Sequence, residues 1–460
     1  MKKQVFNPYM PSWEYVPDGE PHVFGDRVYV YGSHDIYNGW VFCLGDYICY
    51  SAPVDDLTDW RYEGVIYPKT EDPINREGKM NLYAPDVTQG PDGRYYLYYM
   101  YDHLDIVSVA VCDTPAGQYK FHGYVHYPDG TLYGRNAAAG DEPQFDPGVL
   151  TEGDKTYLYT GFGRVNDPTR HGAMVTVLDR DMLTVLQDPK IIVPTKSHSA
   201  GTEYEGHAFF EASSIRKYNG TYYFVYSSEV CHELCYATSD RPDGDFTYGG
   251  VLISNRDVNI DTFKPADMKM APGGNNHGGL VLANGQYYIF YHRHTNGTSY
   301  SRQACAEPIA MEADGSFRQV EMTSCGLNGG PLVGKGYYPA YIACHVFGEK
   351  GMPKIMQDGR DGDENPGYVA NITDTGTVGF KVFEFDGSVS QIKLFVRGYG
   401  VGYYEVKTAW DGEVLARVDV VRANVWEEFS APITLPVGTH SLYFTFRGVA
   451  SSSLGGFELI

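Results

Sequence analysis

Short strands of one hydrophobic pattern recur along the first three quarters of the chain. Each copy begins at a tight turn that contains glycine and continues into a run of β-branched and aromatic residues, which is typical of a β-hairpin. The copies can be aligned on one tyrosine each, and these are Tyr29, Tyr96, Tyr157, Tyr223 and Tyr288.

The spacing of these tyrosines predicts a propeller. Neighbouring copies lie 61 to 67 residues apart. A single hairpin cannot bury both of its faces, whereas radially stacked units of four strands can, and a repeat of this length is typical of propeller blades. Because long helical periodicity is absent and turn residues are frequent (53 Gly and 26 Pro), we expect an all-β chain with five blades.

The pattern changes after the fifth copy. Glycine and aspartate become frequent for a short stretch, and short alternating strands such as 392–397 then follow. About 95 residues of such strands are typical of a β-sandwich. We therefore predict a five-bladed β-propeller over residues 1–345, a linker over 346–365 and a C-terminal β-sandwich over 366–460.

Composition narrows the possible partners. The formal net charge of −22 argues against nucleic-acid binding, because an acidic surface repels phosphate groups. No run of about 18 apolar residues predicts a membrane span. The basic N-terminus lacks the apolar segment of a secretory signal, and eight cysteines are too few for a disulfide framework, so we expect a cytoplasmic protein. Nothing in the composition indicates an oligomeric state.

An acidic residue or a histidine precedes each repeated tyrosine by 10 to 12 residues. In order these are Asp18, Asp86, Asp146, Glu211 and His277. In a propeller the innermost strand of every blade lines the central axis. Equivalent positions on five blades should therefore converge on one pocket.

Clustered carboxyl groups predict chemistry. Like charges repel in a partly desolvated site, so such a cluster implies a bound cation or acid–base catalysis. Hydrolysis of a glycosidic bond requires one carboxyl group to protonate the leaving oxygen and a second to activate water or attack the sugar. A third can raise the pKa of the acid. A single aspartate at a strand start is usually a turn residue, so the shared register carries the functional interpretation.

At these residues the sequence resembles glycoside hydrolase family 43, over about residues 5–340. The resemblance is carried by the segments around Asp18 (Pro-Asp-Gly-Glu-Pro-His-Val-Phe), Asp146 (Phe-Asp-Pro-Gly) and Glu211 (Phe-Glu-Ala-Ser-Ser-Ile-Arg-Lys). It implies a five-bladed propeller and an inverting mechanism. In that mechanism Asp18 would be the general base, Glu211 the general acid and Asp146 the residue that modulates the pKa of the acid.

Two of these motifs leave rival residues. The first-blade motif of the family usually reads Asp-Pro-Ser, whereas Asp18 is followed by Gly-Glu-Pro, so Glu20 is a second candidate for the base. Near Glu211, both Glu203 and Glu205 are rivals for the acid. Glu205 lies 18 residues before the repeated tyrosine, about six too many, and the spacing therefore favours Glu211.

Position along the repeats also suggests substrate contacts. The residues expected to bind sugar are His34, Trp40, Asp86, Phe209, His277 and Arg302, and Asp35, Tyr83 and Arg293 are further candidates. The resemblance implies that His277 could lie beside a calcium ion, often through water. Calcium prefers oxygen ligands, and the alternative is that His277 orients a neighbouring carboxylate.

The expected substrate is an oligosaccharide. By resemblance we expect release of terminal α-L-arabinofuranosyl residues from plant-type oligosaccharides, with β-xylosidase or β-D-galactofuranosidase activity as alternatives. A non-catalytic sugar-binding propeller is the alternative of a different class. The sandwich weakly resembles carbohydrate-binding module family 6, and its Trp410 and Trp426 are either sugar platforms or core residues. We expect this domain to brace the propeller.

Overall fold

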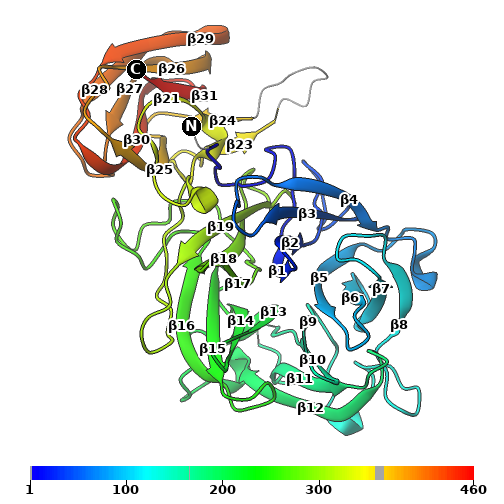
Figure 1. Cartoon of the computed structure of the whole chain (residues 1–460). Coiled ribbons are helices and arrows are strands. Elements are labelled where there is room, and N and C mark those ends of the chain that lie inside the picture. Colours follow the sequence, from blue (N-terminus) through cyan, green and yellow to red (C-terminus); the bar gives the residue numbers. More distant parts are fainter. Residues whose placement is uncertain (1–2, 165, 358–366) are drawn as a thin grey trace.

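The computed structural model describes residues 3–164, 166–357 and 367–460. Its strands form a ring of five small sheets with a second domain at one side (Figure 1). The helices of the described residues are single 3₁₀ turns: η1 (Pro73–Asn75), η2 (Ala137–Ala139), η3 (Lys196–His198), η4 (Gly326–Asn328) and η5 (Ala340–Ile342). No helix in this part of the chain has the length and apolar character needed to cross a membrane.

Each sheet of the ring is an antiparallel blade whose strands follow one another in sequence. Blade one contains β1 (Glu20–Phe24), β2 (Arg27–Tyr31), β3 (Tyr47–Pro53) and β4 (Arg61–Tyr67). Blade two contains β5 (Leu82–Gln89), β6 (Tyr95–Tyr101), β7 (Ser108–Cys112) and β8 (Lys120–Tyr124). Blade three contains β9 (Gly148–Glu152), β10 (Lys155–Thr160), β11 (Gly172–Leu178) and β12 (Val185–Pro194). Blade four contains β13 (Phe209–Tyr218), β14 (Thr221–Ser228), β15 (Glu233–Ser239) and β16 (Thr247–Ser254). Blade five contains β17 (Leu280–Ala283), β18 (Gln286–Arg293) and β19 (Gln303–Ile309).

The N-terminal segment lies along the outer edge of the fifth blade and closes the ring. The Asn7 amide donates to the Ala306 carbonyl at 2.9 Å and accepts from its N–H at 3.1 Å. The Tyr9 N–H donates to the Ala304 carbonyl. Residues from the two ends of the propeller therefore complete one blade together.

The predicted repeat corresponds to the inner hairpin of each blade. The five aligned tyrosines lie in β2, β6, β10, β14 and β18, which are the second strands of the five blades. The strands before them, β1, β5, β9, β13 and β17, face the middle of the ring (Figure 1). The predicted all-β, five-bladed propeller with a following sandwich is thus confirmed.

The second domain is a sandwich of two six-stranded sheets around one apolar core. One sheet contains β20 (Leu332–Val333), β22 (His345–Phe347), β25 (Thr377–Phe385), β27 (Val401–Lys407), β28 (Ala416–Val420) and β30 (Gly438–Val449). The other contains β21 (Gly336–Pro339), β23 (Lys354–Met356), β24 (Tyr368–Ile372), β26 (Gln391–Gly398), β29 (Ala423–Pro432) and β31 (Ser452–Leu459).

The sandwich begins earlier in the chain than the predicted residue 366. Strands β20 to β23 fall in the predicted propeller and linker, yet β20 pairs with β25 and β21 pairs with β31. These strands contain only two to four residues, too few for an alternating pattern to be recognised. The predicted linker residues 358–365 lie outside the described residues.

Buried charges join the two domains. Lys381 Nζ, on the sandwich strand β25, lies 2.8 Å from the Asp257 Oδ2 atom of the propeller, and His345 Nε2 lies 2.6 Å from the same oxygen. All three side chains are almost fully buried. Trp410 belongs to the same interface, because its backbone N–H donates to the Phe263 carbonyl of the propeller. Its ring packs against Tyr443 of the sandwich.

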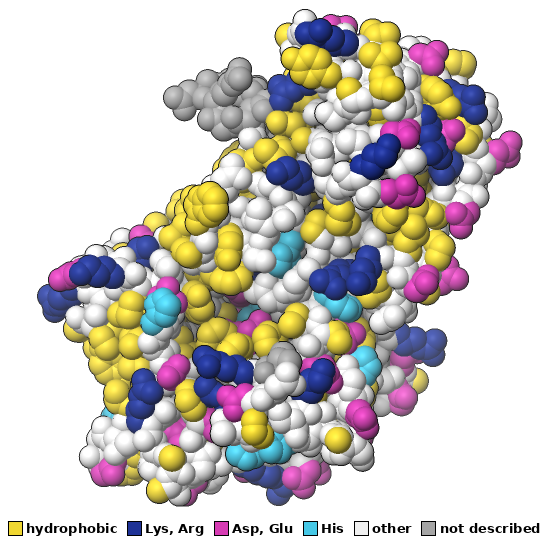
Figure 2. Space-filling view, turned by 180° about the vertical axis from the view of Figure 1, so that it is seen from behind, with side chains coloured by type: hydrophobic (Ala, Val, Ile, Leu, Met, Phe, Trp, Pro, Cys, Tyr) yellow, Lys and Arg dark blue, Asp and Glu magenta, His cyan; other side chains and the backbone are white. Residues whose placement is uncertain are grey.

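The surface seen from behind carries a mixture of charges. On the face in Figure 2, lysine and arginine side chains are interspersed with acidic ones over both domains. The described residues visible there form no single basic patch.

Candidate active site

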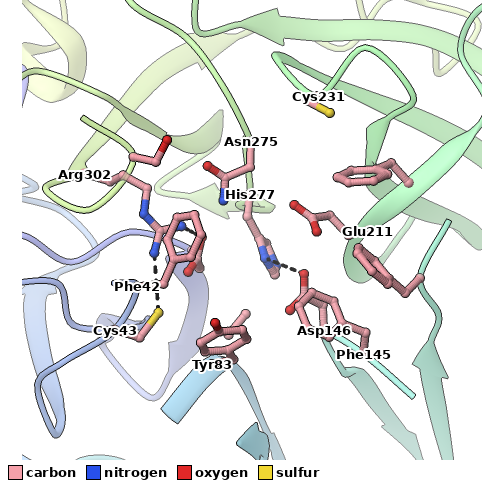
Figure 3. Close-up of a pocket in the computed structure, with 15 residues that line it drawn as sticks. Phe42, Cys43, Tyr83, Phe145, Asp146, Glu211, Cys231, Asn275, His277 and Arg302 are labelled. Carbon is pink, nitrogen blue, oxygen red and sulfur yellow. Dashed lines mark hydrogen bonds and ion pairs between the residues drawn. The ribbon is translucent and has the colours of Figure 1, made fainter. Parts of the chain in front are cut away.

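A cavity of about 350 Å³ lies where the inner strands of the blades meet (Figure 3). Its polar wall consists of Asp18, Asp146, Glu211, Asn275, His277, Ser299 and Arg302. Its apolar wall consists of Phe42, Cys43, Tyr83, Ala84, Phe145, Phe162, Phe210 and Cys231. The structure therefore brings together three carboxyl groups from three different blades, together with the histidine of a fourth.

The backbone departs from regular strand geometry at each of these carboxyl groups. Asp18, Asp146 and Ala212 have φ angles of 57°, 42° and 69°, in the left-handed region that most residues avoid. Such conformations cost roughly 1–3 kcal/mol each and persist only where surrounding contacts enforce them. The pairing of β13 with β14 also shifts register on both sides of Glu211, and a bulge of this kind redirects side chains.

Asp18 is held as a buried anion. Its Oδ1 atom lies 3.0 Å from Arg302 Nη1, and its backbone N–H donates to His292 Nδ1 at 3.2 Å. Burial would raise the pKa of Asp18, but the charge of Arg302 lowers this pKa well below its ordinary value. The Asp18 carboxylate is therefore ionised at neutral pH. Because its pKa is low, it accepts a proton only from a donor whose own acidity has been increased.

Arg302 is itself fixed by a second carboxylate. Its Nε and Nη2 atoms donate to the two oxygens of Asp35 at 2.9 and 3.0 Å, and its guanidinium lies over the ring of Phe42. Paired hydrogen bonds of this type hold arginine in one orientation. Asp35 therefore positions the arginine that faces Asp18.

Glu211 and Asp146 form a coupled acidic pair on the opposite side of the pocket. Burial and the neighbouring Asp146 raise the pKa of Glu211 well above its ordinary value. Burial also raises the pKa of Asp146, to about 7. Asp146 Oδ2 accepts the Ala212 N–H at 3.1 Å and lies 3.6 Å from His277 Nδ1. Because these contacts favour a negative charge on Asp146, the shared proton resides on Glu211.

His277 lies between two carboxylates. Its Nδ1 atom faces Asp146, and its Nε2 atom lies 3.5 Å from Glu20 Oε1. Burial alone would lower the pKa of this histidine, but Glu20 and Asp146 raise it to about 9. His277 is consequently a cation that orients Asp146, which matches the alternative expectation for this residue.

The structure corrects the predicted aromatic contact on β13. Phe209 is 1% exposed and packs in the core of blades three and four, whereas Phe210 lines the pocket. Phe209 pairs with Ser228 and Glu211 with Ser227, so one extra residue lies between the two pairs. Regular alternation would have placed Phe209 and Glu211 on one face, and the bulge removes that alternation.

Three other expected sugar contacts lie outside the cavity lining. His34 is bound to Glu14 Oε1 at 2.9 Å and to the Asp46 carbonyl, so its ring holds a loop. The Trp40 side chain is 88% exposed. Asp86 accepts the N–H groups of Val87 and Val149, and thereby joins blade two to blade three.

The rival residues also have other roles. Glu203 and Glu205 are exposed. Glu203 accepts a hydrogen bond from the backbone N–H of Tyr248, and Glu205 accepts one from that of Gly201. Glu20 is buried against Arg216 and does not line the cavity. Arg293 donates to the Asn7 and Ala343 carbonyls, so it anchors the N-terminal segment.

Sequence reasoning missed several residues of the site. Phe42, Phe162, Phe210 and Asn275 line the cavity, and His292 supports Asp18. His292 Nε2 lies 2.7 Å from the Asn275 carbonyl while its Nδ1 accepts the Asp18 N–H, so the ring is neutral with its proton on Nε2. Its place four residues after Tyr288, at the end of a repeated strand, was the available signal.

Two groups of described residues could in principle hold a metal ion. One is Glu20, His22 and Asp86, and the other is His207, Glu233 and Cys235. In the first group a guanidinium is already present, because Arg216 Nη2 lies 2.8 Å from Glu20 Oε2 and 3.3 Å from His22 Nε2. The guanidinium therefore already occupies the space that a metal ion would take among Glu20, His22 and Asp86.

Comparisons with known proteins agree with this geometry. A family model described as glycosyl hydrolases family 43 matches residues 17–317. A "Xylosidase/arabinosidase" of Thermoclostridium stercorarium is 61% identical over all of this chain and 99% of its own length. Another "Xylosidase/arabinosidase", of Bacteroides ovatus, is 31% identical over 68% of this chain and 97% of its own length.

Solved structures show the same architecture. An arabinoxylan arabinofuranohydrolase of Bacillus subtilis, in complex with cellotetraose, aligns with a TM-score of 0.54 at 21% identity, over 98% of this chain and 97% of its own. A β-xylosidase/α-arabinofuranosidase from a compost microbial metagenome, described as a calcium-free form with xylotriose, aligns with a TM-score of 0.53 at 27% identity, over 68% of this chain and 96% of its own. With the family model and the full-length relative in agreement, this chain belongs to family 43 of the glycosyl hydrolases.

Proposed function

We propose that this glycoside hydrolase releases terminal α-L-arabinofuranosyl residues from plant-type oligosaccharides, with inversion at the anomeric carbon. The observation that carries the proposal is the opposite state of two carboxyl groups in one pocket. Arg302 keeps Asp18 ionised, whereas burial and Asp146 keep Glu211 protonated. A base and an acid with pKa values shifted in opposite directions are what glycosidic hydrolysis requires.

In the proposed reaction Asp18 removes a proton from a water molecule as that water attacks the anomeric carbon. The bond between this carbon and the glycosidic oxygen breaks, and Glu211 transfers its proton to the departing oxygen from the other face of the sugar. Asp18 ends protonated and Glu211 ionised, and exchange with solvent restores both. Asp146 stabilises the protonated state of Glu211 before the bond breaks.

The dimensions of the pocket support attack on a terminal sugar. A volume of about 350 Å³ is near the lower end for ligand pockets, which span about 300–1,000 Å³. Tyr83, Phe145 and Phe162 also line a neighbouring cavity of about 190 Å³. One sugar ring in the main pocket and the leaving group in the neighbouring cavity would satisfy this arrangement.

A second candidate activity is hydrolysis of β-xylosides. The full-length relative with 61% identity is called a xylosidase/arabinosidase, so both sugars are candidates for this chain. Arabinofuranose and xylopyranose present related hydroxyl groups on rings of different size, and one pocket can accept both.

Release of 4-nitrophenol from aryl α-L-arabinofuranoside, β-D-xyloside and β-D-galactofuranoside tests the proposal. We expect the arabinofuranoside to be cleaved fastest, and Asp18→Ala and Glu211→Ala each to lose about 10²–10⁴-fold in kcat on it. Glu205→Ala, which changes an exposed glutamate of the same blade, is the matched control and should keep full activity. NMR of the fresh product should show the inverted anomer.

Equal activity in the three variants and the wild type would overturn the assignment of Asp18 and Glu211. Sugar binding without cleavage of any aryl glycoside would instead support the sugar-binding alternative.

A further inference from the structure

A buried arginine occupies the propeller axis next to the pocket. The guanidinium of Arg216, on β13, donates from Nη2 to Glu20 Oε2 and to the Pro21 carbonyl, each at 2.8 Å. Its Nη1 atom donates to the Ile215 carbonyl at 2.7 Å. One carboxylate oxygen and two carbonyl oxygens therefore surround a single positive charge.

These contacts cross the axis of the ring. Glu20 and Pro21 lie on β1 of blade one, and Arg216 lies on β13 of blade four. Blades one and four are not neighbours in a ring of five, because blade five separates them. Arg216 therefore ties together two inner strands that face each other across the axis.

The same cluster reaches the pocket through Glu20. Glu20 Oε2 accepts from Ser214 Oγ at 2.8 Å, and Glu20 Oε1 faces His277 Nε2. The chain of contacts runs from Arg216 to Glu20, then to His277, and then to Asp146. Positive and negative groups alternate along it.

The cluster is tightly packed at this point. A Cβ atom at Gly279 would meet Ser214 Oγ at 2.6 Å, Glu20 Oε2 at 2.7 Å and Arg216 Nη2 at 3.3 Å. Even a methyl group would therefore clash with these atoms. A cation therefore has no room between Gly279 and these atoms.

We propose that the guanidinium of Arg216 is the permanent cation of this propeller and supplies, through Glu20, the positive charge that a calcium ion beside His277 would supply. Calcium requires six to eight oxygen ligands, and Glu20 Oε2 and the Pro21 carbonyl already accept hydrogen bonds from Arg216. The second oxygen of Glu20, Oε1, has no hydrogen-bond partner among the described residues and faces His277 Nε2 at 3.5 Å. A second positive charge would also be repelled by the guanidinium at this short range. The fold and the activity of this chain are consequently independent of calcium.

Removal of the guanidinium should expose a calcium site. The ligand atoms of Glu20, His22 and Asp86 lie within 4.8 Å of one another, and the Pro21 carbonyl loses its donor when Arg216 is truncated. Two carboxylates and a carbonyl then surround an empty space of the size of a side chain. Such a set of oxygen donors suits a hard divalent cation.

The wild-type chain gives the first test. After treatment with EDTA and removal of the chelator, the protein is titrated with calcium chloride in a calorimeter, and its thermal unfolding is recorded with calcium and with EDTA. We expect no stoichiometric binding and the same Tm in both conditions. Binding of one calcium ion per chain, with a rise in Tm, would overturn the proposal.

The Arg216→Ala variant gives the second test. We expect a lower Tm than in the wild type and a rise of that Tm on addition of calcium. Arg293→Ala is the matched control, because Arg293 is also buried in the propeller and its N–H groups donate to the Cys305 thiol and to the Ala343 and Asn7 carbonyls. It should lose stability without a calcium response.

A Tm of Arg216→Ala that calcium leaves unchanged would count against the proposed position of the cation. If this variant does not fold, the wild-type titration decides alone. These readouts do not depend on which sugar is hydrolysed, so they remain informative even if the proposed substrate is wrong.

Discussion

The Nη1 atom of Arg302 lies 3.0 Å from the Oδ1 atom of Asp18, and both groups are buried in the wall of the pocket. The two residues are 284 positions apart in sequence, at opposite ends of the propeller. Asp35 holds the other edge of the guanidinium. The ionised state of the proposed base therefore depends on an ion pair between the first and the last blade.

Replacement of Arg302 by Met should move the acid limb of the pH–rate profile. The ion pair lowers the pKa of Asp18, so its removal raises that pKa, and the base becomes protonated at a higher pH. We expect the acid limb of kcat/KM to shift upward by roughly 1–3 pH units. Arg302→Lys, which keeps the charge, is the control and should shift less. An acid limb that stays in place in Arg302→Met would show that another group sets it.

Replacement of Glu211 by Gln should affect substrates according to their leaving groups. A glycoside with a strongly acidic phenol needs little protonation as it departs, whereas a sugar leaving group needs a full proton. The loss in kcat should therefore be large on an arabino-oligosaccharide and much smaller on a 2,4-dinitrophenyl glycoside. Asp18→Asn should impair both substrates to a similar extent. A uniform loss in Glu211→Gln would contradict its role as the acid.

Substitution of the two phenylalanines at the start of β13 should have different effects on stability and on substrate binding. Phe209→Ala truncates a fully buried side chain and should cost about 3–5 kcal/mol of unfolding free energy, measured by urea denaturation. Phe210→Ala should keep most of the stability and raise KM, because that ring lines the pocket. The reverse pattern would show that Phe209, and not Phe210, contacts the substrate.

The stability of the domain interface should depend on Lys381. Its ammonium group is buried against Asp257. Lys381→Met leaves that carboxylate without its main partner, and we expect a loss of about 3–5 kcal/mol in unfolding free energy. The double variant Lys381→Met/Asp257→Asn should recover part of the loss, because the charge of Asp257 is then removed together with its partner. Glu321, whose Oε2 atom lies 2.7 Å from Lys381 Nζ, loses that partner in both variants, so the recovery is incomplete. Additive losses in the double variant would exclude direct coupling between the two residues.

Stability should fall on the acid side of neutrality. Burial lowers the pKa of His294 and of His345 from 6.5 to about 3 in the folded state. As pH falls below about 6.5 the unfolded chain binds protons that the folded chain does not, so the unfolding free energy decreases toward pH 3. The contribution of these histidines is fully present above pH 6.5. His345→Gln should flatten this decline in urea denaturation at several pH values, and an unchanged slope would show that His345 does not contribute.

Much of the site could be predicted because one register repeats five times. The distance to the repeated tyrosine placed Glu211, rather than the exposed Glu205, in the pocket. The same distance located Asp18, Asp146 and His277 beside it. A register of this kind identifies the inner strand of each blade, and inner strands have to meet at the axis of a propeller.

The predictions for Phe209 and Trp40 were wrong because the backbone leaves the regular repeat at these residues, whereas Asp86 keeps the register but binds backbone N–H groups between two blades. The bulge beside Glu211 exchanged Phe209 for Phe210. Trp40 lies in a loop, where no periodic neighbour indicates the direction of its side chain. The strands β20 to β23 are too short to show any alternation, and they form only because longer strands of the sandwich offer them free edges.

The closure of the ring by its N-terminal segment sets the order in which the active site can assemble during synthesis. Asp18 leaves the ribosome 284 residues before Arg302, which corresponds to on the order of 15 to 60 s of translation. During that time the pocket has no fifth blade, and Asn7 has no β19 edge to bind. In the nascent chain the proposed base, the proposed acid and the pKa-modulating aspartate are therefore present but not yet assembled into an active site. Hydrolysis can begin only when the last blade docks against the first.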